Sequence, residues 1–135
     1  MSQKIRVRRH VLARLVKEAR RSGEIECCGL LAGAGGVISE ILPARNALAS
    51  ATKYEIAAEE LFGFFRKIRA HGLDHLGIYH SHPATESFPS TSDIERAYYP
   101  DAAYFIISPR ADAPRPVRAF RIAESRVEEL EIVAE

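Results

Sequence analysis

The segment from Cys27 to Leu42 constrains the fold of this chain more than any other. Cys27 to Ala32 is an unbroken apolar run, and a short run of this kind is typical of a buried β-strand. Gly33 to Gly36 follows, and because glycine adopts left-handed backbone conformations readily, this stretch predicts a tight turn. Val37 to Leu42 is expected to return as the second strand of a hairpin. The sequence therefore predicts a sheet that contains a buried hairpin.

Three helices are expected around this hairpin in the chain. His10 to Arg21 and Ala57 to His71 carry apolar side chains at helical spacing, and a shorter helix is expected from Thr91 to Tyr99. The second helix carries a cluster of aromatic side chains that we expect in the core, namely Phe62, Phe64 and Phe65. Further strands are expected at Ile5–Arg9, Lys53–Ile56, Leu73–His80, Ala103–Ser108, Val117–Ala123 and Arg126–Val133.

The order of these elements indicates the fold class. It is neither a strict alternation of strands and helices nor all-β, which favours an α/β fold of the α+β-like kind: a mixed central β-sheet flanked by helices. The chain has 135 residues, no internal repeat and no long linker, so a single domain over residues 1–135 is expected.

Composition and charge exclude several classes of protein. Lys and Arg number 19 against 18 Asp and Glu, so the net charge of +1 gives no electrostatic basis for a nucleic-acid partner. No apolar run reaches the roughly 18–20 residues of a membrane span, and none follows the basic start Met1–Arg9 as in a secretory signal. Cys27 and Cys28 are adjacent and form no disulfide framework, which favours a reducing, cytoplasmic compartment.

The segment around His80 and His82 carries the chemistry. At the end of a strand, residues two apart point to the same face, so both imidazoles can bind one metal ion. Asp93 follows eleven residues later, at the start of the short helix, and can add a carboxylate oxygen. Three protein ligands leave a fourth position for water, which is the pattern of a catalytic zinc site. Nitrogen and oxygen ligands without thiolate fit Zn²⁺, and other divalent metals stay open.

A metal-bound water needs a carboxylate to accept its proton. Glu26 directly precedes the buried strand and is the candidate, with Glu24 the alternative that residue positions alone leave open. Ser90, three residues before Asp93, can donate its hydroxyl proton to an oxyanion. Competing metal patterns fail, because the chain has neither H-E-x-x-H nor an H-x-E followed by P-C-x-x-C, and it is too short for a barrel hydrolase.

At these positions the chain resembles a known family. His80-Ser81-His82-Pro83, followed by Ser90 and Asp93, is similar to the motif of the JAMM (MPN+) zinc metalloproteases. The segment Glu26–Gly33 resembles the glutamate-containing strand of that family, and the resemblance extends from about Ile5 to Ile122. It implies the MPN/JAMM fold, related to the cytidine deaminase architecture. It also implies that His80, His82 and Asp93 bind zinc, that Glu26 is the general acid/base and that Ser90 stabilises the oxyanion.

The resemblance further implies a substrate class. Family members cut the amide or isopeptide bond after the C-terminal Gly-Gly of ubiquitin or a ubiquitin-like protein. This chain is too short for the insertions with which eukaryotic members grip a second ubiquitin, and it is similar to small bacterial members that process sulfur-carrier proteins. A Gly-Gly tail would thread beside the zinc as an extended strand, with the loops Asn46–Tyr54 and Pro83–Pro89 as candidates to flank it.

The expected partners are therefore a ubiquitin-like or sulfur-carrier protein with a Gly-Gly C-terminus and, as an open option, a second copy of the chain in a homodimer. Nucleic acid and membrane are not expected. The alternative function is a non-catalytic MPN-type module that binds a partner protein. Relatives of that kind have lost one or more of the five site residues, whereas all five are present here.

Overall fold

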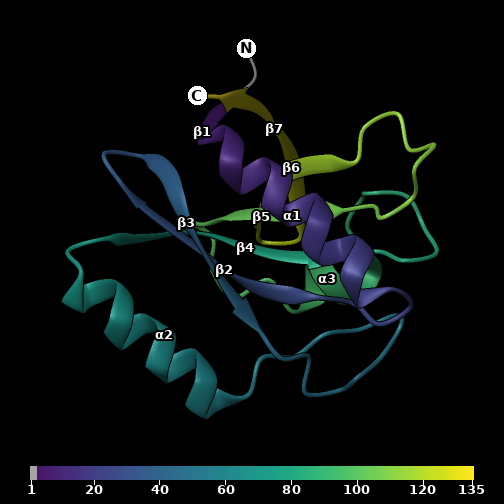
Figure 1. The fold of residues 1–135 in the computed structure, drawn as a ribbon, viewed down its shortest axis with the longest axis horizontal. Coiled ribbons are helices and arrows are strands. Elements are labelled where there is room, and N and C mark those ends of the chain that lie inside the picture. The colour runs from purple at the N-terminus through teal and green to yellow at the C-terminus, as the bar shows by residue number, and fades with distance from the viewer. Residues whose placement is uncertain (1–2) are drawn as a thin grey trace.

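The computed structural model describes residues 3–135 and has ten helices and strands in that range. In chain order they are β1 (Lys4–Val7), α1 (Arg9–Ser22), β2 (Cys28–Ala34), β3 (Val37–Ala44), α2 (Ala58–Ala70), β4 (Asp74–Ser81), α3 (Thr91–Glu95), β5 (Ala103–Ile107), β6 (Val117–Ala123) and β7 (Arg126–Ala134), as Figure 1 shows. Met1 and Ser2, the first residues of the predicted domain and of its basic start, lie outside the described residues.

The seven strands form one mixed sheet that closes into a barrel, in the order β1-β3-β2-β4-β5-β6-β7. β1 closes it by pairing in parallel with β3 and with β7, and β4 pairs in parallel with β5. The predicted mixed sheet is thus confirmed. Its closure was not predicted, because Lys4 lies opposite Glu131 at the other end of the chain and local periodicity does not specify such a partner.

Two apolar clusters cover the two faces of the sheet. Leu31 and Tyr79 belong to the cluster that packs against α1, whereas Leu30 and Ile78, one position away in each strand, belong to the cluster that packs against α2 and α3. Side chains of a strand alternate between faces, so an apolar run that serves both clusters is expected to be continuous. This is why the segment after Cys27 has no polar residue. The segment from His80 to His82, at the end of β4, follows the same alternation.

Two glycines allow the close packing of the central hairpin. A Cβ atom on Gly29 would lie 2.4 Å from the carbonyl oxygen of Leu42 and 2.6 Å from the ring of Tyr79. A Cβ atom on Gly33 would lie 1.8 Å from the carbonyl oxygen of Val37. No larger residue fits at either position without displacing the backbone. Gly29 therefore allows β4 to lie close to β2, which also sets the position of His80, the residue after Tyr79.

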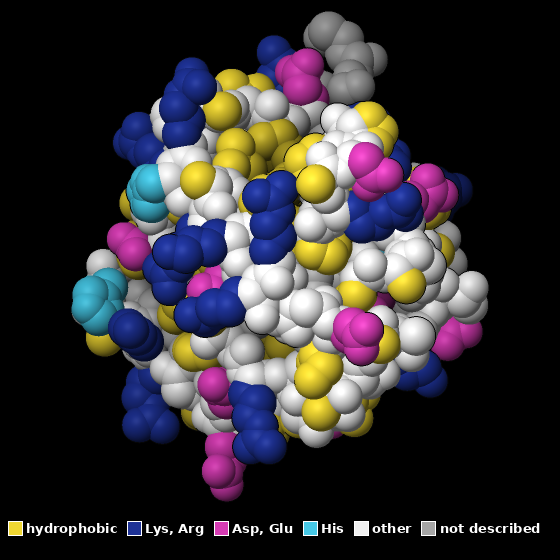
Figure 2. All heavy atoms as spheres, turned by 45° about the vertical axis from the view of Figure 1, so that its right-hand side comes forward, with side chains coloured by type: hydrophobic (Ala, Val, Ile, Leu, Met, Phe, Trp, Pro, Cys, Tyr) yellow, Lys and Arg dark blue, Asp and Glu magenta, His cyan; other side chains and the backbone are white. Residues whose placement is uncertain are grey.

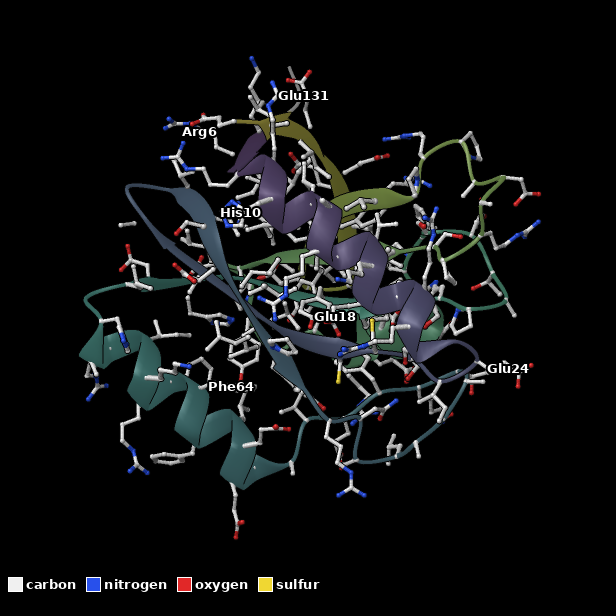
Figure 3. The ribbon with its side chains drawn as sticks, in the orientation of Figure 1. Arg6, His10, Glu18, Glu24, Phe64 and Glu131 are labelled. Atoms are coloured by element: carbon white, nitrogen blue, oxygen red, sulfur yellow. The ribbon has the colours of Figure 1, made fainter. Side chains whose placement is uncertain are left out.

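Three local predictions were wrong. Lys53–Ile56 is not a strand but forms a single bridge between Asn46 and Ile56. The short helix ends at Glu95, because the backbone N–H of Tyr99 donates to the Tyr104 hydroxyl at 2.9 Å instead of continuing the helix. Phe62 is 70% exposed, since it lies roughly 100° around the helix axis from Leu61, outside the face of α2 that packs on the sheet. Phe64 points from α2 toward the sheet, as expected (Figure 3).

The surface carries charges of both signs. On the face in Figure 2, Lys and Arg side chains gather mainly on one side, and Asp and Glu side chains lie between and beside them. Within residues 3–135, none of the helices is both long enough and apolar enough to span a membrane.

Candidate metal centre

The two histidines lie at the end of β4, at the centre of the pairing with β2 and β5. β4 is paired on both sides, so that His80 lies opposite Cys28 of β2 and opposite Ile106 of β5. The backbone N–H of His82 donates to the carbonyl of Ile107 at 2.9 Å, one residue beyond β4. His80 is 1% exposed and His82 4%. The two Nε2 atoms face each other at 3.1 Å, so both rings share one side of the sheet.

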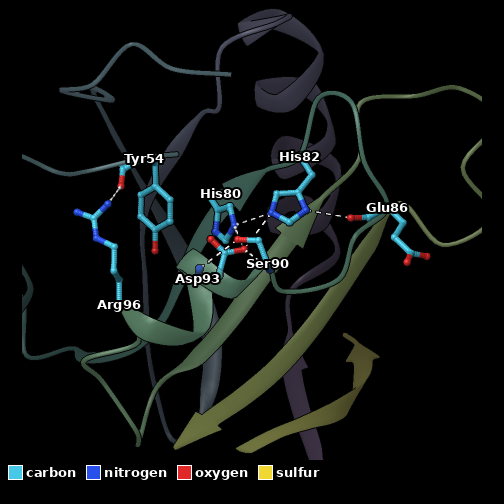
Figure 4. Close-up of polar contacts among 7 residues, drawn as sticks. All are labelled: Tyr54, His80, His82, Glu86, Ser90, Asp93 and Arg96. Carbon is cyan, nitrogen blue, oxygen red and sulfur yellow. Dashed lines mark hydrogen bonds and ion pairs between the residues drawn. The ribbon is translucent and has the colours of Figure 1, made fainter. Parts of the chain in front are cut away.

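Asp93 reaches the same point from the first turn of α3. Its backbone N–H donates to the Ser90 hydroxyl at 3.1 Å, and the Ser90 N–H donates to its Oδ2 at 2.9 Å, which together form a capping box. The same Oδ2 lies 3.1 Å from Nε2 of His80 and 3.0 Å from Nε2 of His82 (Figure 4). Burial raises the pKa of Asp93, but the hydrogen bonds from the two histidines outweigh it and hold the pKa well below its usual range.

These three atoms fit a divalent metal ion. Tetrahedral ligands at the usual Zn–N distance of about 2.0–2.1 Å lie about 3.3 Å apart, close to the separations of 3.0–3.1 Å found here. Burial lowers the pKa of His80, which favours the neutral ring that a metal needs. Each ring donates to the Asp93 carboxylate only with a proton on Nε2, and a divalent cation between the three atoms would take the place of those protons. The described residues hold one such group, made of His80, His82 and Asp93.

The orientation of His82 is fixed from the loop 83–89. Its Nδ1 lies 2.9 Å from the carbonyl oxygen of Glu86, which assigns the proton to Nδ1 and leaves Nε2 free to bind a metal. The loop is anchored by Phe88, whose ring packs on Phe120 at 5.4 Å beneath the guanidinium of Arg118. The sequence analysis missed this anchor, because Phe88 and Arg118 lie 30 residues apart and share no local pattern.

Tyr54 covers the other histidine. Its ring stacks on His80 with centroids 4.5 Å apart and planes 20° from parallel (Figure 4). The Tyr54 carbonyl accepts a hydrogen bond from Arg96 at 3.3 Å, and Arg96 also pairs with Glu55 at 3.0 Å. Neither Tyr54 nor Arg96 was singled out from the sequence, because a lone tyrosine in a loop gives no signal of what it stacks on.

Glu26 lies on the same side of the sheet as the histidines. The Ser81 N–H donates to the carbonyl of Cys27 at 3.0 Å, which extends the β2–β4 register and places Glu26 opposite His82. Glu26 is 3% exposed, and its Oε1 has no hydrogen-bond partner among residues 3–135. Burial raises its pKa to about 8, with a smaller opposing effect from His82. A buried, unpartnered carboxyl group beside a metal site is suited to proton transfer.

Glu24, the alternative base, lies elsewhere. It is exposed, and Figure 3 shows it pointing away from the molecule at the loop that follows α1. Ser90 remains close to the metal ligands through its capping box with Asp93. Because its hydroxyl oxygen accepts the Asp93 N–H, its own proton is available to donate.

A cavity of about 430 Å³ opens beside Asp93. Arg96 and Glu55 lie at its wall, where their ion pair joins α3 to the segment that follows Tyr54. The rest of its lining is mostly aromatic and aliphatic and includes Tyr54, Ile56, Leu61, Tyr98, Tyr99 and Tyr104. An apolar pocket beside a group of convergent polar side chains is the usual form of a ligand site.

Two imidazoles, a carboxylate and a buried glutamate on a mixed α+β fold make the arrangement of a metal-dependent hydrolase. A family model described as prokaryotic homologs of the JAB domain matches residues 8–123. The chain belongs to this family, the prokaryotic branch of the JAMM/MPN group, which confirms the resemblance seen in its motif.

Known proteins resemble the chain over most of its length. The CysO-cysteine peptidase of Mycobacterium tuberculosis is 34% identical over 125 residues, covering 91% of this chain and 86% of the relative. A desampylase of Haloferax volcanii is 38% identical over 87 residues, covering 62% of this chain and 63% of the relative. The solution structure of a protein from Desulfitobacterium hafniense has a TM-score of 0.82 at 29% identity, covering 96% of this chain and 91% of that one.

These likenesses bear on the predictions in different ways. They confirm the mixed α+β fold of the JAB/MPN kind and the prediction of a hydrolytic peptidase or isopeptidase. The relation to the cytidine deaminase architecture stays a prediction, as do the individual roles of Glu26, Ser90, His80, His82 and Asp93.

Proposed function

We propose that this protein is a zinc-dependent peptidase that cleaves the amide or isopeptide bond after the C-terminal Gly-Gly of a ubiquitin-like or sulfur-carrier protein. The observation that carries the proposal is the convergence of His80, His82 and Asp93 on one point beside the buried carboxyl of Glu26. We also propose that the protein acts in the cytoplasm as a single domain over residues 1–135. The free thiols of Cys27 and Cys28 fit a reducing compartment.

In the proposed mechanism, His80, His82 and Asp93 would hold the zinc ion, which supplies a Lewis acid and lowers the pKa of water when bound. Glu26 accepts the proton of the attacking water and passes it to the nitrogen of the leaving amine. Burial supports this role, because it raises the pKa of the Glu26 carboxyl to about 8, near neutral pH, where one group can both accept and donate a proton. The Ser90 hydroxyl donates to the carbonyl oxygen as negative charge develops there.

The burial of the site supports a Gly-Gly tail. His80 and His82 are almost fully covered, and Tyr54 stacks over His80, so a peptide with bulky side chains next to the scissile bond would collide with these groups. A tail that ends in two glycines meets no such obstacle. The apolar cavity beside Asp93 then offers a place for larger side chains further from the cut. We place the tail between the segment that follows Tyr54 and α3.

The relatives support the substrate class. One is named a CysO-cysteine peptidase, and others are named desampylases. These names imply a sulfur-carrier or ubiquitin-like protein as the substrate of those relatives, and they do not specify one leaving group. The leaving group is therefore free to be an amino acid, a lysine side chain or a peptide, and a second copy of the chain is not needed by any step proposed here.

A carrier fused through Gly-Gly to a short peptide tests the proposal. After incubation, intact mass spectrometry should show a carrier that ends at Gly-Gly. The same fusion with Ala-Ala in place of Gly-Gly should stay uncut. Tight binding of the carrier without cleavage by the zinc-loaded protein would instead support the alternative, a non-catalytic binding module.

A further inference from the structure

The loop between β3 and α2 is organised around one buried amide. Asn46 is 9% exposed, and both halves of its side chain are used. Its Nδ2 donates to the carbonyls of Glu26 and Lys53, each at 3.0 Å. Its Oδ1 accepts the N–H groups of Leu48 at 3.0 Å and Glu55 at 3.2 Å. Replacing a buried group with so many partners leaves several backbone groups unsatisfied.

The first consequence concerns Glu26. Its backbone lies just outside the β2–β4 ladder, which begins at Cys28. The Glu26 N–H donates to the carbonyl of Ser50 at 2.9 Å, and its carbonyl accepts from Asn46. Both polar groups of this backbone unit are thus satisfied by the loop rather than by the sheet. The position of the Glu26 side chain therefore depends on the loop that Asn46 holds.

The second consequence concerns Tyr54. Asn46 binds the carbonyl of the residue before it and the N–H of the residue after it, Lys53 and Glu55. The backbone on both sides of Tyr54 is therefore fixed by hydrogen bonds, in the conformation in which its ring stacks on His80. The same segment forms one wall of the cavity beside Asp93. One amide therefore fixes parts of the site that come from two separate stretches of chain.

We propose that Asn46 is a positioning residue, which sets the backbone of Glu26 and the ring of Tyr54 relative to the metal ligands without touching the substrate. This inference rests on the proposed function only for its effect on turnover. The effect of Asn46 on the backbone of Glu26 is expected whatever the substrate is. Thr52 provides a matched control, because its side chain is exposed and its one side-chain hydrogen bond among residues 3–135 is to Ser50 in the same loop.

The experiment compares Asn46→Asp, Asn46→Ala and Thr52→Ala. An ionised aspartate keeps an acceptor for the N–H groups of Leu48 and Glu55 but can donate to neither of the carbonyls that Asn46 binds. Alanine removes both the donor and the acceptor. Zinc content should stay near one ion per chain in all three, since Asn46 contacts none of the ligands. With a Gly-Gly fusion as substrate, kcat should fall roughly 10–100-fold in both Asn46 variants and stay unchanged in Thr52→Ala. Backbone amide exchange of Glu26 should accelerate in both Asn46 variants.

The outcomes separate the two proposals. If the wild type binds zinc but cuts no Gly-Gly fusion, the proposed function is wrong. The backbone amide exchange rates of Glu26 in the Asn46 variants then test the role of Asn46 without reference to turnover. If the wild type cuts the fusion, and folded, zinc-loaded Asn46→Asp cuts it with the same kcat, Asn46 is not a positioning residue. A lower melting temperature with unchanged kcat and unchanged Glu26 exchange would show that Asn46 only stabilises the fold.

Discussion

The proposed metal ligands and the proposed base are held in different ways. His80 is paired to strands on both sides, and a backbone hydrogen bond extends the β4–β5 pairing to His82. Glu26 lies one step beyond the sheet, where a loop satisfies its backbone. In the proposed mechanism, the sheet thus positions the two histidines of the metal site, while a loop positions the proposed base. The two tasks can be disturbed separately, which gives the comparison its tests.

The largest effect is expected from removing a metal ligand. Asp93→Ala and His82→Ala should abolish zinc binding and all turnover, because a site of three ligands cannot lose one and keep its geometry. Elemental mass spectrometry of the purified variants measures this. Thr91→Ala, on the same short helix but exposed, should keep one zinc per chain. Stoichiometric zinc in Asp93→Ala would show that the ligand set is different.

Removing the base should leave the metal in place. Glu26→Gln keeps the shape of the side chain and loses its proton affinity, so kcat should fall about 10²–10⁴-fold while zinc content stays constant. Glu24→Gln is the control, since Glu24 is exposed and points away from the site. Equal kcat values for Glu26→Gln and the wild type would move the base to another residue and remove the distinction drawn here.

A change in the hairpin tests the part of the site that the sheet controls. Gly29→Ala puts a Cβ atom 2.4 Å from the Leu42 carbonyl oxygen, against backbone that cannot easily yield. We expect a loss of about 1–3 kcal/mol in the free energy of unfolding, measured by urea denaturation. Gly63→Ala should instead gain about 0.5–1 kcal/mol, because Gly63 lies inside α2 with open space around it. Equal stability of Gly29→Ala and wild type would contradict the packing argument.

The smallest effect is expected at the anchor of the loop 83–89. Phe88→Ala removes the ring that packs on Phe120 and loosens the Glu86 carbonyl that orients His82. Zinc affinity should fall about tenfold, with kcat of the zinc-saturated enzyme unchanged. Competition with a chelating dye measures the affinity. Phe62→Ala, which removes an exposed ring on α2, should bind zinc as the wild type does, and a matching loss there would argue against a specific anchor.

The same contrast explains what the sequence could predict. His80, His82, Ser90 and Asp93 follow from local rules, because alternation along a strand and a capping box each act over a few residues. Glu26 and Glu24 are distinguished from residue positions only weakly, and burial in the folded chain separates them.

The loop Asn46–Tyr54 was a candidate to flank the tail, but the contacts of Asn46 and Tyr54 could not be predicted from the sequence, since their partners Glu26 and His80 lie 20 or more residues away. The closure of the barrel by β1 was missed for the same reason. The fold prediction was wrong where a local pattern was compatible with two environments, as for Phe62, which was expected in the core and is exposed.

The central claim is that one zinc ion, held by His80, His82 and Asp93, is needed for cleavage after Gly-Gly. The most direct measurement removes metal from the protein with a chelator and then titrates zinc back while cleavage of a Gly-Gly fusion is followed. We predict that activity is absent at the start, rises linearly and reaches its maximum at one zinc per chain. Full activity in the metal-free protein, or no activity at one bound zinc per chain, would contradict the account.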